Sequence, residues 1–332
     1  MKKHHRGLID LHLHLDGSLS LSSVRELAAM QNIPIEENDA QLLQKLQVSP
    51  TCRDLNEYLE KFDFPCSLLQ TEAAITRSVQ NLCAELADQG LLYAEIRYAP
   101  QFHLLKGLNQ TQVVEAAIAG LDQEKFRANL ILCCMRGSDN HEANLETVRV
   151  ASRYVGKGVC AVDLAGAEAL FPTEDFEDLF ALAKELGVPY TIHAGEACGP
   201  ESVYTALRFE TKRLGHGVRS VEDAALVARL AAEGVALELC PTSNLNTSIF
   251  ERIEDYPIRR LMAAGVKVTV NTDNMMVSGV TLASEMELVT EAFGLTREER
   301  MGLSMNAARA SFAPEEVKQI LYRQIEARYE MK

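Results

Sequence analysis

Two histidines separated by one residue lie near the start of the chain, where residues 10–16 read DLHLHLD. Apolar and polar residues alternate in this segment, and successive side chains of a strand point to opposite faces. We therefore expect one face to carry all four polar side chains, Asp10, His12, His14 and Asp16. Two imidazoles at this spacing can chelate one metal ion. A solvated strand face would give the same alternation, so the motif alone does not decide between the two.

Histidine or aspartate recurs at the ends of three later apolar segments. These segments end in TIHAGE at 191–196, in GHG at 215–217 and in NTDN at 271–274. A lone histidine at a strand end is more often a hydrogen-bonded structural residue than a ligand, but four such ends are hard to explain in that way. Asn244 also lies near a strand end, and no role follows from its position. We expect the other four histidines at the surface: His4, His5, His103 and His141.

One subset of these residues has the composition of a zinc site. His12, His14, His193 and Asp273 would supply three nitrogens and one carboxylate and would leave one position open for water. An ion held there would lower the pKa of that water to about 7. Glu196 follows His193 closely and is not needed as a ligand, so it is free to transfer protons.

Eight short apolar segments alternate with stretches of helical periodicity, and several of those stretches end in glycine. This alternation is typical of an α/β fold, the (β/α)8 TIM-type barrel, in which functional residues lie at the C-terminal ends of parallel strands. The predicted strands are 7–12, 91–97, 129–135, 159–164, 189–193, 213–216, 235–239 and 266–271. The predicted helices include 71–89, 112–126, 173–186 and 221–233.

Residues 18–89 hold more helical segments than one strand-to-strand crossover needs. We expect them to form a helical insertion after the first strand, over the C-terminal mouth of the barrel. Residues 281–329 are expected to add C-terminal helices. No internal repeat, low-complexity tract or linker interrupts the sequence, which therefore predicts a single domain over residues 1–332.

Overall charge argues against two classes of partner. The chain carries 33 Lys and Arg against 47 Asp and Glu, a formal net charge of -14, and such a surface repels nucleic-acid phosphates and anionic lipid. Residues 1–6 are basic, but polar residues interrupt the stretch that follows, so we predict no export signal. The eight cysteines include no C-x-x-C pair and are expected to be reduced thiols of a cytoplasmic protein. The oligomeric state does not follow from the sequence.

In order and spacing, the motifs resemble those of the adenosine deaminase family. The resemblance includes HLHLDG at 12–17, DLAG at 163–166, HAGE at 193–196, GHG at 215–217 and TD at 272–273, and it extends over almost the whole chain. It implies a barrel enzyme with one Zn²⁺ per chain. The implied reaction is hydrolysis of adenosine and 2′-deoxyadenosine to inosine, 2′-deoxyinosine and ammonia in purine salvage, with a purine nucleoside as the only implied ligand besides the metal.

The resemblance also implies a role for each site residue. The metal would be held by His12, His14, His193 and Asp273. A hydroxide activated by it would attack the purine carbon that bears the amine. Glu196 would protonate the adjacent ring nitrogen, and His216 would orient the attacking water. The backbone N–H of Gly166 would contact another ring nitrogen, and Asp16 would bind the 5′-hydroxyl of the ribose.

Two residues are assigned two roles each, and the roles of two others leave a choice open. Asp273 is also placed among the catalytic residues, and His14 among the substrate-binding ones. Phe62 is expected, with Phe64, on an apolar wall over the sugar, although packing between helices would explain both phenylalanines equally well. Asn274 stands where many family members have a second aspartate. The resemblance implies that the residue at this position hydrogen-bonds purine N7. The asparagine amide can donate that hydrogen bond without being protonated, so the contact to N7 can survive, while the effect of the change on purine selectivity stays open.

Other functions remain compatible with the sequence. The chain would also fit a deaminase of another aminopurine, such as adenine or a modified adenosine, a nucleoside-binding protein without turnover, or a phosphoesterase with an H-x-H metal site. Asp16 favours a nucleoside, because adenine deaminase-like relatives tend to carry glutamate there. Glu196 favours turnover, since a binding protein needs no proton shuttle beside a metal. No basic cluster accompanies the motifs to bind a phosphate.

Overall fold

Eight parallel strands form two four-stranded sheets in a computed structural model that describes residues 7–330. The first sheet contains β1 (Ile9–His14), β2 (Tyr93–Tyr98), β3 (Ala128–Met135) and β4 (Val159–Ala165). The second contains β5 (Ile192–Ala194), β6 (Arg213–His216), β7 (Ala236–Leu239) and β8 (Lys267–Val270). Each strand pairs with the next one along the chain within its sheet. A strand is present at each of the eight predicted places, with bounds that differ from the prediction by up to three residues. Residues 1–6 lie outside the described residues, so the predictions that His4 and His5 lie at the surface and that no export signal begins there concern residues that the structure does not describe.

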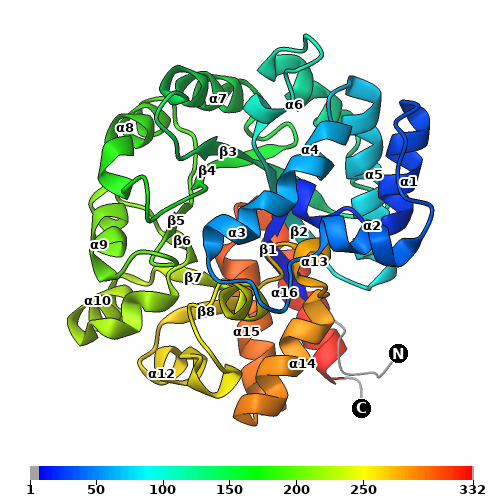
Figure 1. Cartoon of the computed structure of the whole chain (residues 1–332). Coiled ribbons are helices and arrows are strands. Elements are labelled where there is room, and N and C mark those ends of the chain that lie inside the picture. The colour runs from blue at the N-terminus through cyan, green and yellow to red at the C-terminus, as the bar shows by residue number, and fades with distance from the viewer. Residues whose placement is uncertain (1–6, 331–332) are drawn as a thin grey trace.

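Isolated parallel bridges join the two sheets at both seams. Val162 of β4 pairs with Tyr190 just before β5, and Leu13 of β1 pairs with Asp273 just after β8. At the second seam, His14 N donates to Asp273 O at 2.7 Å and Asp273 N donates to His12 O at 2.8 Å. The result is the predicted barrel arrangement, seen from one end in Figure 1, with the strands at the centre and helices around them. These hydrogen bonds also fix the backbone of three predicted metal ligands.

Further helices follow the strands, most of them on the outside of the ring. They are α6 (Gln110–Ala119), α7 (His141–Tyr154), α8 (Glu177–Glu185), α9 (Pro200–Arg208), α10 (Ala224–Glu233), α11 (Pro241–Asn246), α12 (Ile258–Ala263), α13 (Met275–Ser278) and α14 (Leu282–Phe293). The prediction for 112–126 was wrong at both ends. Asn109 forms a capping box with Gln112 and starts α6 two residues early, and the helix stops before Gly120 because glycine disfavours helix continuation.

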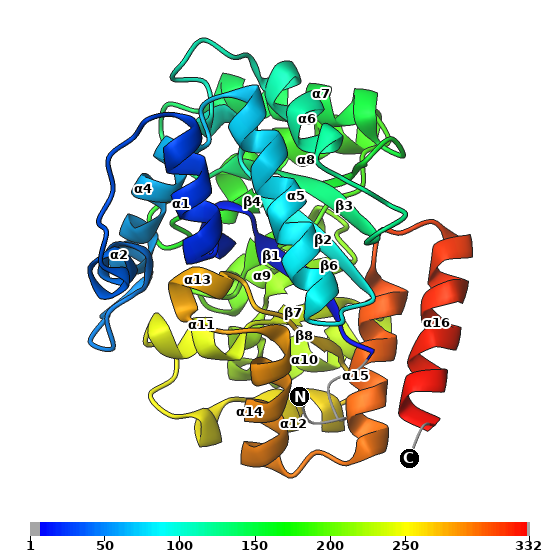
Figure 2. The same ribbon diagram turned by 90° about the vertical axis from the view of Figure 1, so that its right-hand side faces the viewer.

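The helical insertion expected after the first strand is present between β1 and β2. It contains α1 (Leu21–Met30), α2 (Asp39–Leu46), α3 (Leu55–Leu59), α4 (Asp63–Leu68) and α5 (Glu72–Asp88). Side-chain oxygens cap four of these helices by accepting backbone N–H groups: Ser20, Asn38, Asp54 and Thr71. Figure 2 shows α2 and α4 on the side of the molecule opposite to α16 (Glu315–Glu330), the last helix. These two helices therefore lie away from α16, whereas Arg328 of α16 donates to Gly90 O just after α5 at 2.7 Å.

Two further helices complete the described chain, α15 (Arg297–Ala310) and α16 (Glu315–Glu330). Their apolar residues pack with Ile9, Leu11 and Tyr93 in a separate buried cluster on the outer face of β1 and β2. All eight cysteines are free, and six of them are buried. Over residues 7–330, no helix has the length and apolar character that a membrane span requires.

Candidate active site

The four predicted metal ligands converge where strands of the two sheets end. The donor atoms of His12, His14, His193 and Asp273 all lie within 4.8 Å of one another, and all four residues are largely buried. Asp273 Oδ1 lies 3.3 Å from His12 Nε2 and 3.4 Å from His14 Nε2. His12 Nε2 is buried without a hydrogen-bond partner. A cation between these acceptors would satisfy them, so the residues present fit a metal ion.

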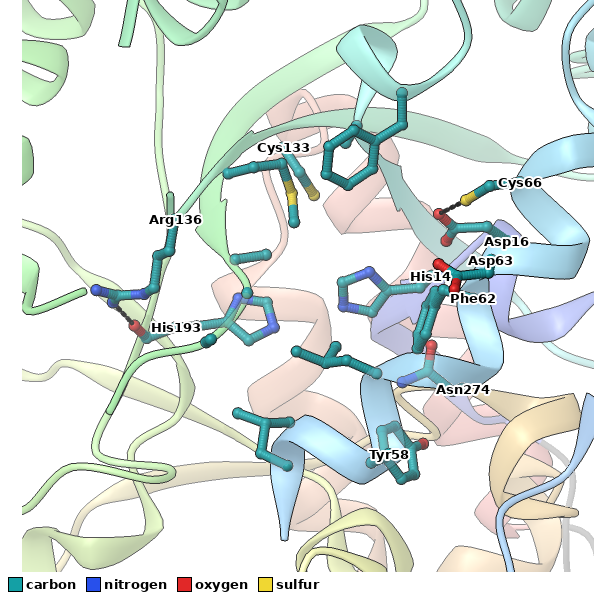
Figure 3. A pocket seen from close by; sticks show the side chains of 18 of the residues that line it. His14, Asp16, Tyr58, Phe62, Asp63, Cys66, Cys133, Arg136, His193 and Asn274 are labelled. Atoms are coloured by element: carbon teal, nitrogen blue, oxygen red, sulfur yellow. Dashed lines mark hydrogen bonds between the residues drawn. The ribbon is translucent and has the colours of Figure 1, made fainter. Parts of the chain in front are cut away.

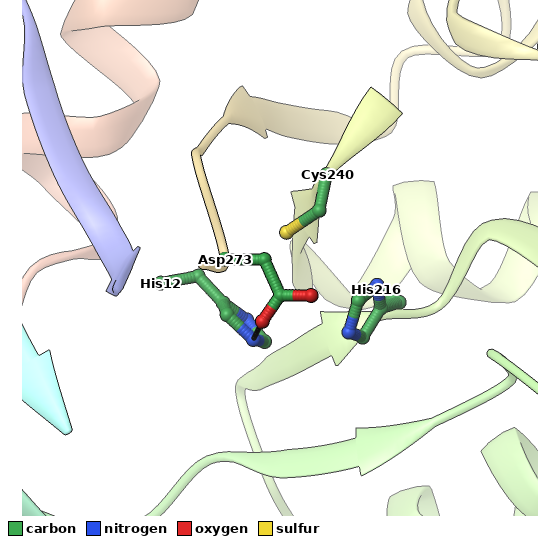
Figure 4. A group of neighbouring side chains, drawn as sticks. All are labelled: His12, His216, Cys240 and Asp273. Carbon is green, nitrogen blue, oxygen red and sulfur yellow. Dashed lines mark ion pairs between the residues drawn. The ribbon is translucent and has the colours of Figure 1, made fainter. Parts of the chain in front are cut away.

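A second set of possible ligands shares two members with the first. Figure 4 shows His12, His216, Cys240 and Asp273 around the same point, with their donor atoms also within 4.8 Å of one another. Burial raises the pKa of the Cys240 thiol well above its usual value, which disfavours the thiolate that binds metals. The first set, with three imidazoles and one carboxylate, is therefore the better site for a divalent ion.

Two buried carboxylates hold the outer nitrogens of the ligand histidines. Glu238 Oε2 lies 2.8 Å from His12 Nδ1, and Asp163 Oδ2 lies 2.9 Å from His193 Nδ1. Arg97 pairs with both carboxylates, at 2.8 Å each. Carboxylates in this position orient ligand imidazoles and keep Nε2 available to the metal. No role for these three residues was predicted from the sequence, although charged side chains inside strands buried on both faces were a visible signal.

A cavity of about 590 Å³ lies between the ligand cluster and the helices of the insertion. Nine predicted site residues line it: His14, Asp16, Phe62, Gly166, His193, Glu196, His216, Asp273 and Asn274. Figure 3 shows His14 and His193 facing each other across this space, with Phe62 and Tyr58 on the side of the insertion. His12 lies behind the lining. Phe64 is absent from the lining and packs against the hydrophobic core instead, so only Phe62 is positioned to contact a ligand.

Glu196 is buried in this cavity on a turn that another carboxylate holds in place. Burial raises the pKa of Glu196 well above its usual value, and the negative charges of Asp273 and Glu168 add to the effect. Glu168 accepts the backbone N–H groups of residues 195–198 at 2.8 to 3.0 Å. A carboxyl with a raised pKa can stay protonated near neutral pH and act as an acid. Glu168 was missed because its sequence context carries no metal or proton-transfer signal.

His216 and Asp273 share an uncommon backbone conformation. Their φ angles are 57° and 59°, in the left-handed region that costs a residue other than glycine on the order of 1–3 kcal/mol. Gly215 lets the neighbouring rings approach, because a Cβ there would lie 3.0 Å from the His12 ring and 3.2 Å from His193. Strain of this kind concentrates at functional sites, and here it directs both side chains into the ligand cluster.

The far end of the cavity carries two carboxylates. Burial raises the pKa of Asp16 to about 6, and Cys66 Sγ donates to Asp16 Oδ2 at 3.4 Å. Figure 3 shows Asp63 beside Asp16. Asn274 lies nearby with its oxygen packed so closely on Gly17 that a Cβ at Gly17 would clash with it. This contact leaves the amide nitrogen of Asn274 on the cavity side (Figure 3).

One histidine expected at the surface is buried. The side chain of His103 is 1% exposed, and neither ring nitrogen has a hydrogen-bond partner among the described residues. Its ring packs beside that of Tyr98. The surface prediction for His103 was therefore wrong, because its loop folds back onto the strand. His141 is exposed, as expected.

A buried glutamate supports the loop after β7. Glu285 of α14 accepts a hydrogen bond from the backbone N–H of Thr242 at 2.9 Å and another from the Thr242 hydroxyl. Burial raises the pKa of Glu285 from 4.5 to about 7. The folded state therefore holds this proton more tightly than the unfolded chain does. Stability from this group is present below about pH 4.5 and is lost as the pH rises through about 7.

Glu285→Gln should remove this loss. The free energy of unfolding of both proteins is measured in urea. The difference between the variant and the unmodified protein should grow in favour of the variant by on the order of 3 kcal/mol as the pH rises from about 4.5 to 8. Glu291→Gln changes an exposed residue of the same helix and serves as the control, with a constant offset across this pH range. Parallel pH curves for Glu285→Gln and the unmodified protein would contradict the raised pKa.

Comparison with known proteins connects this site to a family. A family model described as adenosine deaminase matches residues 8–328. An adenosine deaminase from Haemophilus ducreyi is 46% identical, over 97% of this chain and 96% of that protein. The crystal structure of an adenine deaminase from Arthrobacter aurescens aligns with a TM-score of 0.88 at 27% identity, over 97% of this chain and 98% of that one. An Arabidopsis N6-mAMP deaminase aligns with a TM-score of 0.86 at 26% identity, over 98% and 99%. The chain belongs to the adenosine deaminase family.

Proposed function

We propose that this protein is a zinc-dependent hydrolase that converts adenosine and 2′-deoxyadenosine to inosine and 2′-deoxyinosine with release of ammonia, in purine salvage. The observation that carries the proposal is the meeting of a metal-fitting cluster and a buried glutamate with a raised pKa in one cavity. The family match and the 46% identity to an adenosine deaminase support the reaction class.

The assigned metal ligands are His12, His14, His193 and Asp273. Zn²⁺ bound by them would act as a Lewis acid that lowers the pKa of a coordinated water to about 7. Glu196, protonated, would donate to the purine ring nitrogen beside the carbon that bears the amine. That donation draws electrons from the carbon and makes it easier to attack. His216 lies 3.5 Å from Glu196, measured between Nε2 and Oε1, and is assigned to orient the attacking oxygen.

The remaining lining residues are assigned to hold the nucleoside. Gly166 has a φ of 105° and no side chain, so a purine edge can approach its backbone N–H closely. The amide nitrogen of Asn274 is assigned to donate to N7. Phe62 and Tyr58 supply apolar surface on the side of the insertion. Asp16 is assigned to the 5′-hydroxyl of the sugar.

Charge at the far end of the cavity supports a nucleoside over a nucleotide. Asp16 and Asp63 would repel a 5′-phosphate. Among the described lining residues, Arg136 is the only arginine or lysine. Its guanidinium already donates to Phe171 O, to Thr173 Oγ1 and to His193 O, and these hydrogen bonds hold it against the protein.

The other aminopurines suggested by the structural neighbours define the test. Adenosine, 2′-deoxyadenosine, adenine, AMP and N6-methyl-AMP are compared at equal concentration, with ammonia release as the readout. Turnover of the two nucleosides well above the other three is the expected result. Preferred turnover of adenine or of a nucleotide would contradict the substrate assignment while leaving the deaminase chemistry intact.

Replacing Asp16 should affect substrates according to their sugar. Asp16→Ala is expected to lower kcat/KM for adenosine by about 10- to 100-fold, the value of a charged hydrogen bond worth about 1.5–3 kcal/mol. Any residual activity on free adenine should not change, because adenine has no 5′-hydroxyl. Initial rates on both substrates check this result. Equal losses on adenosine and adenine would contradict the sugar contact.

A further inference from the structure

The loop after β7 places one buried amide against the ring of His216. Asn244 Nδ2 lies 3.2 Å from His216 Nδ1. Both side chains are almost completely buried, with Asn244 at 0% and His216 at 1% exposure. Because water is excluded, these two groups must satisfy each other, so one must donate the hydrogen bond and the other must accept it. Asn244 belongs to the PTSN segment of α11, to which the sequence analysis assigned no role.

The orientation of the amide follows from its second partner. The hydroxyl of Tyr256, itself 2% exposed, donates to Asn244 Oδ1 at 3.1 Å. With Oδ1 engaged by Tyr256, the amide must present its NH₂ group to His216. An amide and its partners are assigned in this way from the network as a whole.

The amide nitrogen can only donate, so His216 Nδ1 must be the acceptor. A neutral ring that accepts at Nδ1 carries its proton on Nε2. Nε2 is the atom that lies 3.5 Å from Glu196 Oε1 and faces the cavity. The chain from Tyr256 through Asn244 to His216 thus determines which nitrogen of His216 donates into the active site.

We propose that Asn244 and Tyr256 are positioning residues that hold His216 in the Nε2–H tautomer, so that this ring donates a hydrogen bond to the attacking oxygen and does not accept a proton from it. The inference rests on the proposed function for its catalytic consequence, but the tautomer itself is a property of the folded protein. Glu196 follows β5, His216 is the last residue of β6, and Asn244 and Tyr256 lie between β7 and β8.

The tautomer can be measured directly. In zinc-loaded protein with ¹⁵N-labelled histidine, two-bond ¹H–¹⁵N correlation spectra distinguish Nε2–H from Nδ1–H rings, and His216→Gln identifies the signal by its loss. We expect His216 to show Nε2–H with an unprotonated Nδ1. An Nδ1–H signal would overturn the proposal, because the amide of Asn244 would then have to face the other way.

Two variants test the support. Asn244→Leu is close to isosteric and removes the donor, and Tyr256→Phe removes only the hydroxyl that orients the amide. In Asn244→Leu we expect mixed tautomers and a kcat for adenosine lower by about 10- to 100-fold, with KM unchanged. This loss is smaller than the roughly 10⁴-fold cost of a fully wrong tautomer at a catalytic histidine, because the freed ring still samples the correct one. Tyr256→Phe should change both readouts in the same direction by less.

Matched controls separate positioning from general damage. Asn246→Leu makes the same substitution two residues away on α11, and Tyr93→Phe removes a buried hydroxyl that pairs with Asn129 elsewhere in the barrel. Both should leave the His216 tautomer and kcat unchanged. If Asn244→Leu keeps the Nε2–H signal and the full kcat, the proposal is wrong. If the unmodified protein shows Nε2–H but no deamination of adenosine, the proposed function fails and the tautomer assignment stands. If Asn244→Leu does not fold, Tyr256→Phe carries the test.

Discussion

Glu196→Gln is expected to lower kcat for adenosine by about 10²- to 10⁴-fold, the usual contribution of general acid–base catalysis. Glutamine keeps the size of the side chain but has no acidic proton to donate. Because burial already favours the neutral form of Glu196, the substitution adds no buried charge and should leave the fold intact. Steady-state kinetics, with metal analysis and circular dichroism on the same sample, check the three expectations together.

The control for this variant is Glu201→Gln. Glu201 is an exposed residue in the first turn of α9, five positions along the chain, so its replacement should leave kcat unchanged. Activity of Glu196→Gln within a few-fold of the unmodified enzyme would remove Glu196 from the mechanism. Loss of both activity and metal would instead indicate a structural role at the ligand cluster.

Arg97→Met is expected to cost about 3 to 5 kcal/mol of folding free energy, the typical result of breaking a buried ion pair from one side. Arg97 is fully buried and pairs with Asp163 and Glu238 at 2.8 Å each, and it also donates to Leu11 O at 2.5 Å. Methionine fills part of the volume but leaves two carboxylates without their shared cation. Urea unfolding of the metal-free protein measures the loss without a contribution from metal binding.

The same substitution should weaken metal binding, because Asp163 and Glu238 orient two ligand histidines. A competition titration with a chromophoric chelator measures this affinity, and outer partners of ligand histidines are typically worth about 10- to 100-fold. Arg229→Met is the matched control, since Arg229 pairs with Glu233 on the exposed face of α10 and should change stability by less than about 0.5 kcal/mol. Equal stability and metal affinity in the two variants would contradict the role of the buried charges.

Much of the fold and the centre of the site could be predicted from the sequence because their signals are local. Polar residues at the ends of apolar strands stand out against the pattern of a buried sheet, and four of them give a recognisable donor set. The strands themselves are short apolar segments between helical stretches, a periodicity that neighbouring residues determine. The predicted boundaries of α6 were wrong because a capping box and a glycine decide where that helix begins and ends, and the apolar pattern does not.

Residues whose role depends on a distant partner could not be found in this way. Glu168 accepts four backbone N–H groups of a different loop. Asn244 contacts the ring of His216 and the hydroxyl of Tyr256, which the sequence pattern does not place near it. Arg97 and Glu238 were visible as charges within buried strands, but their pairing across the barrel, 141 residues apart, appears only in three dimensions. His103 was misplaced for the same reason, since a polar loop sequence does not reveal that the loop folds inward.

The most direct test of the account combines metal content with adenosine turnover on one preparation of the purified chain. We predict about one zinc ion per chain, conversion of adenosine to inosine with one ammonia released, and loss of that activity on chelation with recovery when zinc is restored. Zinc bound at this stoichiometry without turnover of adenosine would contradict the proposed reaction. Full turnover in chelated, metal-free protein would contradict the proposed metal chemistry.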